Sequence, residues 1–102
     1  MVVAEVSIVP IGTKTTSVSK YVANAIIAIK ENDKVRHRLT AMGTLLEGNL
    51  DDVLESIKVM HNSVFNENVK RVITSIKIDD RRDKGLSLDN KVHSVLKKLS
   101  NL

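Results

Sequence analysis

Residues that could do chemistry gather in three places along this sequence of 102 residues. The densest is the charged run Asp79–Lys84, which follows an apolar stretch and precedes Gly85. The second is Thr44–Glu47, where a hydroxyl and a carboxylate flank two leucines just before a glycine. The third is a set of three histidines that are far apart in sequence: His37, His61 and His93. Each arrangement corresponds to a different kind of site.

The charged run contains three carboxylates, which are oxygen ligands of the kind that Ca²⁺ prefers. A calcium loop, however, needs acids at alternate positions, a glycine and a later glutamate. Basic residues interrupt the acids here, and cations so close would repel a metal. The sequence therefore predicts no metal site. We expect a strand-to-helix corner whose acids and bases pair with one another or with a neighbouring subunit, with direct ligand recognition as the alternative.

Thr44 and Glu47 are predicted to lie on a central strand that ends where the next helix begins. A buried carboxylate at that edge could accept two parallel hydrogen bonds from the ring nitrogen and the amino group of an aminopyrimidine, a strong pairing where water is excluded. The alternative is that Glu47 supports the N-terminus of the helix that follows it.

The histidines have no evident acid-base partner. None has a second histidine at metal-binding helical spacing, and the sequence shows neither a Ser-His-Asp arrangement nor a glycine-rich phosphate loop. We therefore expect a protein that is not an enzyme and needs no metal or other cofactor. An unrecognised hydrolase would need an acid beside His61 in a closed pocket.

The elements that must position these groups follow from hydrophobic periodicity. Alternation of apolar and polar residues predicts four strands, over 2–12, 35–40, 43–48 and 71–79. The apolar faces of the first and last strands are expected to meet the helices: Val2, Ala4, Val6, Ile8 and Pro10, and Val72, Thr74, Ile76 and Ile78.

The helical spacing of apolar residues predicts three helices, over 18–29, 50–64 and 88–99, with a loop over 66–70. The residues expected on inner helix faces include Leu54 in the second helix and, in the third, Leu88, Val92, Val95, Leu96 and Leu99. The predicted N-cap residues of the three helices are Thr16 or Ser17, Asn49, and Ser87.

This order predicts a ferredoxin-like α+β sandwich, βαββαβ, with a four-stranded antiparallel sheet, two helices on one face and an extra C-terminal helix. We expect residues 1–102 to form a single domain. The uncovered sheet face is predicted to be half apolar, with Val3, Val9, Ile11 and Ile73 among Glu5, Ser7, Ser75 and Lys77. Such a face indicates an oligomer interface or a ligand surface.

Composition and charge bear on whether the protein binds nucleic acid or membranes. The net charge is +4, but basic residues are mixed with acids along the chain, which is typical of a solvated surface. RNA-recognition domains stack bases on aromatics of the central strands, whereas Tyr21 and Phe65 fall in predicted helices. We expect no nucleic-acid binding. With no cysteine, no apolar run of membrane length and no basic leader, we expect no membrane association and a cytoplasmic location.

Four segments together resemble the thiamine-binding protein family over nearly the whole chain: VAEVSIVPIGT, MGTLLEGNLDDVLESI, RVITSIKIDDRRDK and LDNKVHSVLKKL. The most specific pieces are Pro10–Thr13, Thr44-x-x-Glu47-Gly48, and Arg71 followed by Ile78–Arg81. The resemblance implies a ferredoxin-like fold, a homodimer or homotetramer, and no established catalysis. It also implies a cytoplasmic carrier or sensor that binds thiamine or its hydroxymethylpyrimidine half.

We therefore expect a non-enzymatic small-ligand-binding protein that acts as a homo-oligomer. The predicted polar contacts to the ligand come from Glu5, Thr44 and Glu47. Ser7 is predicted to provide a supporting hydroxyl. Ile11 and Leu45 are predicted to form the apolar walls. The predicted subunit contact consists of Asp79, Asp80 and Arg81. The alternative function is a regulatory or assembly domain that binds a protein partner or an anionic effector.

Overall fold

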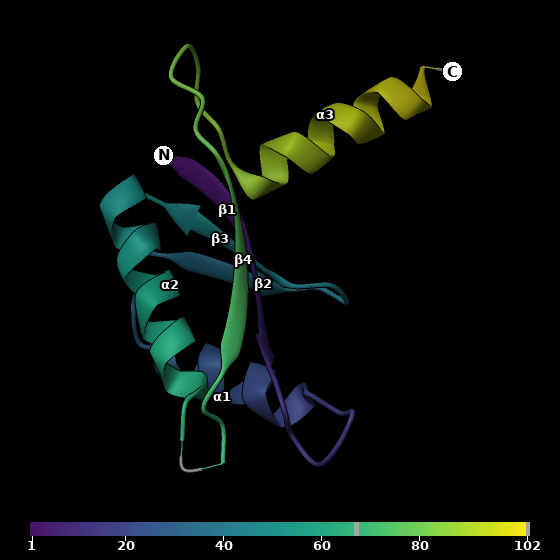
Figure 1. The fold of residues 1–102 in the computed structure, drawn as a ribbon. Helices are drawn as coiled ribbons and strands as arrows, with labels where there is room; N and C mark the ends of the chain where they lie inside the picture. The colour runs from purple at the N-terminus through teal and green to yellow at the C-terminus, as the bar shows by residue number, and fades with distance from the viewer. Residues whose placement is uncertain (67, 102) are drawn as a thin grey trace.

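The computed structural model describes residues 1–66 and 68–101. Its elements are, in chain order, β1 (Val2–Pro10), α1 (Ser19–Ile29), β2 (Arg36–Leu39), β3 (Thr44–Gly48), α2 (Leu50–Val64), β4 (Val72–Asp79) and α3 (Leu88–Ser100). This is the predicted βαββαβ order followed by one more helix (Figure 1).

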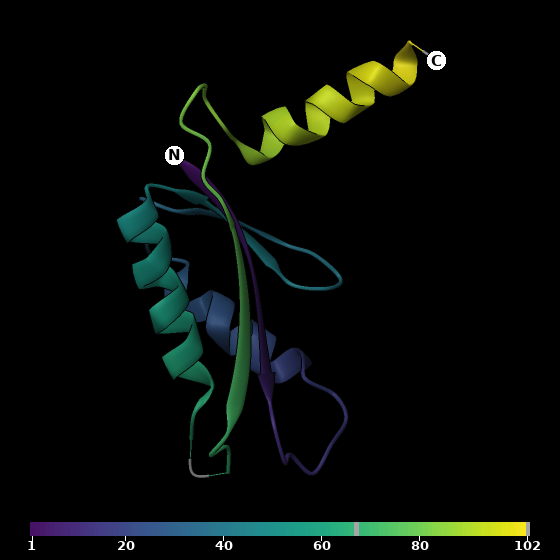
Figure 2. The same ribbon diagram turned by 45° about the horizontal axis from the view of Figure 1, so that its top comes forward.

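The four strands form one sheet in the order β2-β3-β1-β4, and each neighbouring pair is antiparallel. Helices α1 and α2 cover one face of this sheet, and α3 extends from the other side (Figures 1 and 2). The predicted ferredoxin-like α+β fold is therefore confirmed. The two strands at the centre, β1 and β3, are those predicted to be central.

The core lies between the sheet and the two helices. Alternate residues of β1 point to the same face, so Val2, Ala4 and Val6 are all buried there. On the central strand β3, Leu46 is fully buried. Helix α2 contributes residues at helical spacing: Val53, Ile57, Met60 and Val64. Burying one such side chain stabilises the fold by about 1.5–3 kcal/mol.

Two details of the helices differ from the predictions. The N-cap of α1 is Val18, without a side-chain cap, so the predicted cap at Thr16 or Ser17 was wrong. Hydroxyls of this loop bond within the loop instead: the Ser17 N–H donates to Thr15 Oγ1. The N-cap of α3 is Ser87, as predicted, and its Oγ accepts a hydrogen bond from the backbone N–H of Asn90 at 3.0 Å.

Asn49 is the N-cap of α2 as predicted, but its side chain does not accept a capping hydrogen bond. Leu54 was placed on the inner face of α2, yet its side chain is exposed. The loop predicted after α2 includes residue 67, which lies outside the described residues.

Helices cover the first half of β4 only. Thr74 contacts α2, since its hydroxyl lies 2.6 Å from His61 Nδ1. Ile76 and Ile78 are on the same strand face but are 48% and 38% exposed. The prediction that this apolar face meets the helices was therefore wrong for the second half of the strand. The physical reason is that β4 is an edge strand, and the helices lie over the strands at the centre.

Beyond its first turn, helix α3 extends away from the body of the molecule (Figures 1 and 2). Of its residues, all within the described range 68–101, Leu88 alone is buried. The predicted inner side of the helix is otherwise exposed, and its uncovered residues define what we call the α3 stripe: Val92, Val95, Leu96 and Leu99. Among the described residues, no helix is long and apolar enough to cross a membrane.

Candidate ligand-binding site

The sheet divides the six predicted ligand-binding residues between its two faces. Val6 lies opposite Thr44, and Glu5 lies opposite Leu45. Because side chains alternate along a strand, Thr44 shares the helix-covered face with Val6 and is buried. The other five share the open face: Glu5, Ser7, Ile11, Leu45 and Glu47. The structure therefore does not bring all six side chains into one site.

Glu47 holds the start of α3. Its carboxylate is 5% exposed, and Oε2 accepts a hydrogen bond from the backbone N–H of Leu88 at 3.0 Å. Oε1 lies 3.7 Å from Nη1 of Arg36. An anion at a helix N-terminus is favoured by the helix dipole. Glu47 thus supports a helix, but that helix is α3 rather than the one that follows it in sequence.

A groove of about 210 Å³ lies on the open face where α3 begins. Glu5 and Leu45 line it together with Lys77, Asp79 and Lys91. Asp79 and Lys91 form an ion pair at one side of the groove. The groove therefore brings two predicted ligand residues together, among charged groups of both signs.

The charged run after β4 pairs within itself. Arg81 donates to Asp83 at 2.6 Å, and Arg82 donates to Asp80 at 2.8 Å. The hydrogen bond from Arg82 lowers the pKa of the Asp80 carboxyl below its ordinary value. Arg81 does the same to the pKa of Asp83. These pairs fit the expected salt-bridged corner, and within residues 1–66 and 68–101 no group of acids and histidines is arranged to hold a metal ion.

Among the described residues, the hydrogen-bond partner of His61 is not the acid that a hydrolase would need. The Nδ1 atom of His61 lies 2.6 Å from the Thr74 hydroxyl, and its ring packs edge-on against Phe65 at a centroid distance of 5.3 Å. This hydrogen bond can orient the imidazole ring, but a neutral hydroxyl is not the carboxylate partner that the hydrolase hypothesis requires. In the part of the chain that the structure describes, the hydrogen bond of His61 is thus made to a neutral side chain.

A second, less open cavity of about 130 Å³ lies on the helix-covered side, at the end of β3. Its walls come from β1, from α1 and from the turn at residues 40–43. Most of the lining is apolar and includes Val6, Ile8 and Met60. Polar groups come from Thr44 and from Tyr21, the aromatic residue of α1. An apolar pocket with a few polar groups is the usual form of a small-molecule site.

The cavity exists because β3 is shorter than β1. The two strands pair from Val2 to Val6, where Val6 lies opposite Thr44. Beyond that point β1 continues to Pro10 and pairs with β4 alone. We call this unpaired side of β1, at residues 7–10, the free edge. Helix α1 and the turn at residues 40–43 surround the free edge, which leaves the cavity between them.

The turn at residues 40–43 approaches β1 closely. Thr40 closes the turn, with its backbone N–H donating to the carbonyl oxygen of Gly43 at 2.9 Å. A Cβ atom at Gly43 would lie 3.0 Å from the carbonyl oxygen of Val6. Glycine is therefore the residue that lets this turn form the wall of the cavity.

Of the six predicted ligand residues, Thr44 and Ser7 line this cavity. Thr44 does so from the helix-covered face, whereas the strand position of Ser7 directs its side chain to the open face. Sequence reasoning did not assign Tyr21 to a site. A signal was available, since Tyr21 is one of two aromatic residues in the chain. Its position beside Val22 on a helix face made it equally compatible with the core.

Comparison with known proteins identifies the family. The sequence profile described as "Thiamine-binding protein" matches residues 4–96. The UPF0045 protein YqgV of Bacillus subtilis is 44% identical over 102 residues, covering 97% of this chain and 98% of that protein. A UPF0045 protein of Methanothermobacter thermautotrophicus is 45% identical over 100 residues, covering 97% of this chain and all of that protein.

Solved structures agree with the sequence comparison. Protein MJ1052 of Methanocaldococcus jannaschii superposes with a TM-score of 0.84 at 48% identity, covering 92% of this chain and 94% of that one. A candidate thiamine biosynthesis or salvage protein of Thermotoga maritima has a TM-score of 0.74 at 18% identity, covering 92% and 97%; this likeness concerns the fold alone. On the sequence identities and the profile match, the chain belongs to the thiamine-binding protein family.

Proposed function

We propose that this protein binds thiamine or its hydroxymethylpyrimidine half in the cavity at the free edge of β1, without catalysing a reaction. The observation that carries the proposal is the position of Thr44 and Tyr21 in an apolar cavity of a chain from this family. Pockets for drug-sized ligands measure roughly 300–1,000 Å³. A cavity of about 130 Å³ therefore suits a single ring, so the pyrimidine half enters and the thiazolium ring stays at the entrance.

Calorimetric titration with thiamine and with hydroxymethylpyrimidine tests this proposal. We expect saturable binding of both molecules, and about tenfold weaker binding after Thr44→Val, since one hydrogen bond contributes about 0.5–1.5 kcal/mol. Ser75→Ala, an exposed change on the opposite sheet face, is the matched control and should bind like the original protein. Absence of heat and of thermal stabilisation at millimolar concentrations of both molecules would refute the proposal.

We also propose that the protein acts as a homo-oligomer in the cytoplasm. The absence of cysteine is consistent with a reducing compartment. The accessible surface is 7301 Å², about 1,600 Å² more than the roughly 5,700 Å² expected for a compact monomer of 11.3 kDa. Each partner in a standard interface buries about 800 Å². The extra surface is thus large enough for contacts with two further copies, and the α3 stripe supplies four exposed apolar side chains for such a contact.

The alternative function, a regulatory or assembly domain, is favoured by the same stripe, because an amphipathic helix can also bind another protein. Native mass spectrometry of the purified protein distinguishes ligand binding by an oligomer from the regulatory or assembly function. A dimer or tetramer that retains a small molecule supports ligand binding by an oligomer. An empty monomer would contradict both parts of the proposal.

A further inference from the structure

We propose that the free edge of β1 recognises its ligand through the backbone of Ile8, which pairs with a neutral planar ring that carries a hydrogen-bond acceptor next to a donor. The inference rests on the proposed function, because it specifies how the same cavity selects its ligand. A 4-aminopyrimidine has this pattern, with a ring nitrogen beside an amino group.

The direction of the Ile8 backbone groups follows from strand alternation. The N–H of Ile11, the residue after β1 ends, donates to the carbonyl oxygen of Arg71 at 2.8 Å, which directs it toward the β4 side. In an antiparallel sheet, the N–H and C=O of one residue point to the same neighbouring strand, and successive residues alternate. Ile8 is an odd number of residues away from Ile11. Its N–H and C=O therefore point away from β4, toward the side where β3 would continue.

Among the described residues, no strand pairs with Ile8 on that side. The last pair between β1 and β3 is Val6 with Thr44, and Ile8 lines the cavity beyond it. A backbone donor and acceptor are thus presented side by side at the wall of an apolar space. Backbone polar groups away from bulk water need a partner, and a ligand with the complementary pair of groups can take the place of the missing strand.

The rest of the cavity fits the same class of ligand. Apolar side chains such as Val22 and Met60 can contact the faces of a ring, and Tyr21 adds an aromatic wall. No charged side chain of the described residues lines the cavity. Burying an unpaired charge is costly, so the ring that enters is neutral. The hydroxyl of Thr44 is available to a polar substituent on the ring, such as a hydroxymethyl group.

The test changes the ligand rather than the protein, because most substitutions keep the backbone N–H and C=O of Ile8, and proline, which removes the N–H, would also disturb the strand. Hydroxymethylpyrimidine is compared by calorimetry with an analogue in which a methyl group replaces the amino group. The analogue keeps the shape and loses the donor. We expect at least tenfold weaker binding of the analogue. In parallel, the backbone amide of Ile8 should shift in the NMR spectrum on addition of hydroxymethylpyrimidine and exchange its hydrogen more slowly, whereas the amide of Ser7, directed at β4, should change less.

The outcomes separate this inference from the proposed function. Equal affinity for the two molecules, or an Ile8 amide that does not respond to a ligand that binds, would overturn recognition by the free edge and leave ligand binding intact. Failure of hydroxymethylpyrimidine and thiamine to bind at all would overturn both.

Discussion

Glu47 and Gly43 show how single residues shape the site. Both lie at the ends of the short strand β3 or just outside it, and each makes one contact that its local sequence does not reveal. The carboxylate of Glu47 accepts the N–H of Leu88, which is 41 residues away. Gly43 leaves room for the carbonyl oxygen of Val6. The first contact positions a helix, and the second positions a cavity wall.

Replacing Glu47 by alanine should destabilise the protein and leave ligand affinity almost unchanged. The change leaves the buried N–H of Leu88 without its acceptor, which costs about 1–3 kcal/mol. Urea unfolding should show this loss, and calorimetry should show an affinity within about twofold of the original, which is less than one hydrogen bond contributes. Glu55→Ala, an exposed acid of α2, should be nearly neutral in both measurements. A large loss of affinity in Glu47→Ala would place this carboxylate in the ligand site.

Replacing Gly43 by alanine should destabilise the turn and weaken ligand binding together. The new Cβ would lie 3.0 Å from a backbone oxygen that cannot move freely, and overpacking of this kind typically costs about 1–3 kcal/mol. Gly85→Ala is the matched control, because a Cβ there meets no atom within 4 Å. Thermal unfolding and calorimetry of the two variants check the prediction. Equal behaviour of the two variants would show that the turn adjusts without cost.

At the scale of elements, α3 is attached to the body at its first turn only. Besides the Leu88–Glu47 hydrogen bond, Asp89 forms ion pairs with Arg38 at 2.7 Å and with Arg36 at 3.5 Å. These arginines lie on β2, so the outermost strand on that side and the last helix are joined by charges. Exposed ion pairs are weak individually, but here they orient the helix relative to the sheet.

The attachment of α3 should weaken in acid. The hydrogen bond from Arg38 lowers the pKa of Asp89 in the folded protein. A lowered carboxyl pKa means that the pair contributes fully above the ordinary aspartate value of about 3.9, and that this contribution is lost as the pH falls through the lower folded-state value. NMR signals of the first turn of α3 should therefore change below about pH 4. Asp89→Asn should remove the part of that change that comes from this pair; an identical profile in the variant would contradict the assignment.

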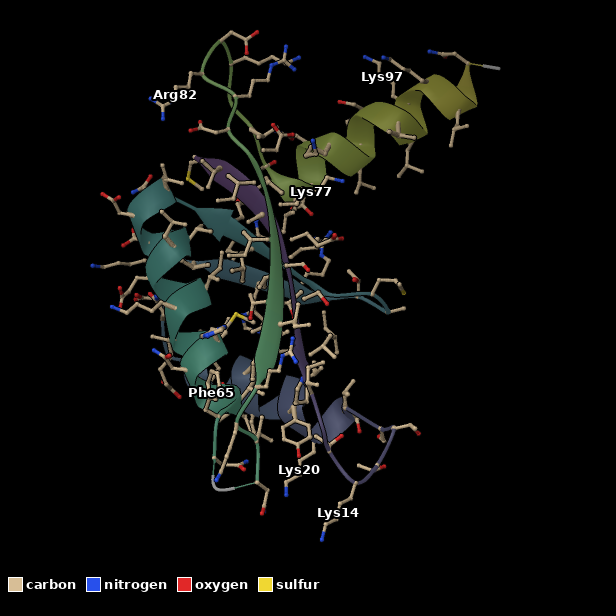
Figure 3. The ribbon with its side chains drawn as sticks, in the orientation of Figure 1. Lys14, Lys20, Phe65, Lys77, Arg82 and Lys97 are labelled. Carbon is tan, nitrogen blue, oxygen red and sulfur yellow. The ribbon has the colours of Figure 1, made fainter. Side chains whose placement is uncertain are left out.

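At the scale of the whole molecule, the fold leaves much surface uncovered. The radius of gyration is 15.3 Å, against about 13 Å for a compact domain of this length. The extended shape comes from α3, which carries the α3 stripe into solvent. Figure 3 shows Lys97 on the side of α3 turned away from the sheet, so the helix has one charged side and one apolar side. A surface of this kind is expected to be covered in the functional state.

A charge placed on the α3 stripe should reduce the size of the homo-oligomer that we propose. Val95→Asp puts a carboxylate among Val92, Leu96 and Leu99, where contact with another copy would strip it of water. Ser94→Asp introduces the same charge one residue earlier, outside the stripe, and should leave the assembly intact. Light scattering during size-exclusion chromatography measures both. Equal masses for the two variants would show that the stripe is not the subunit contact.

The local periodicity of apolar residues predicts the strands and helices of this protein. Alternation along β1, helical spacing along α2 and a serine before α3 are short-range patterns, because backbone geometry alone sets the period of side-chain direction. They were enough to predict the order of strands and helices, the two-layer fold and the N-cap positions of two helices. Two of the cavity residues, Ser7 and Thr44, were also among the predicted ligand residues.

The tertiary structure decided which distant residues meet. The relative lengths of β1 and β3 create the free edge at Ile8, and they follow from where the chain turns at residues 40–43 rather than from any periodicity. The packing of α1 against that edge brings Tyr21 to the cavity. The path of the chain after β4 brings the start of α3 to Glu47, so that this carboxylate accepts the N–H of Leu88. Side-chain period determines which face a residue occupies, whereas strand register and chain path determine what it faces.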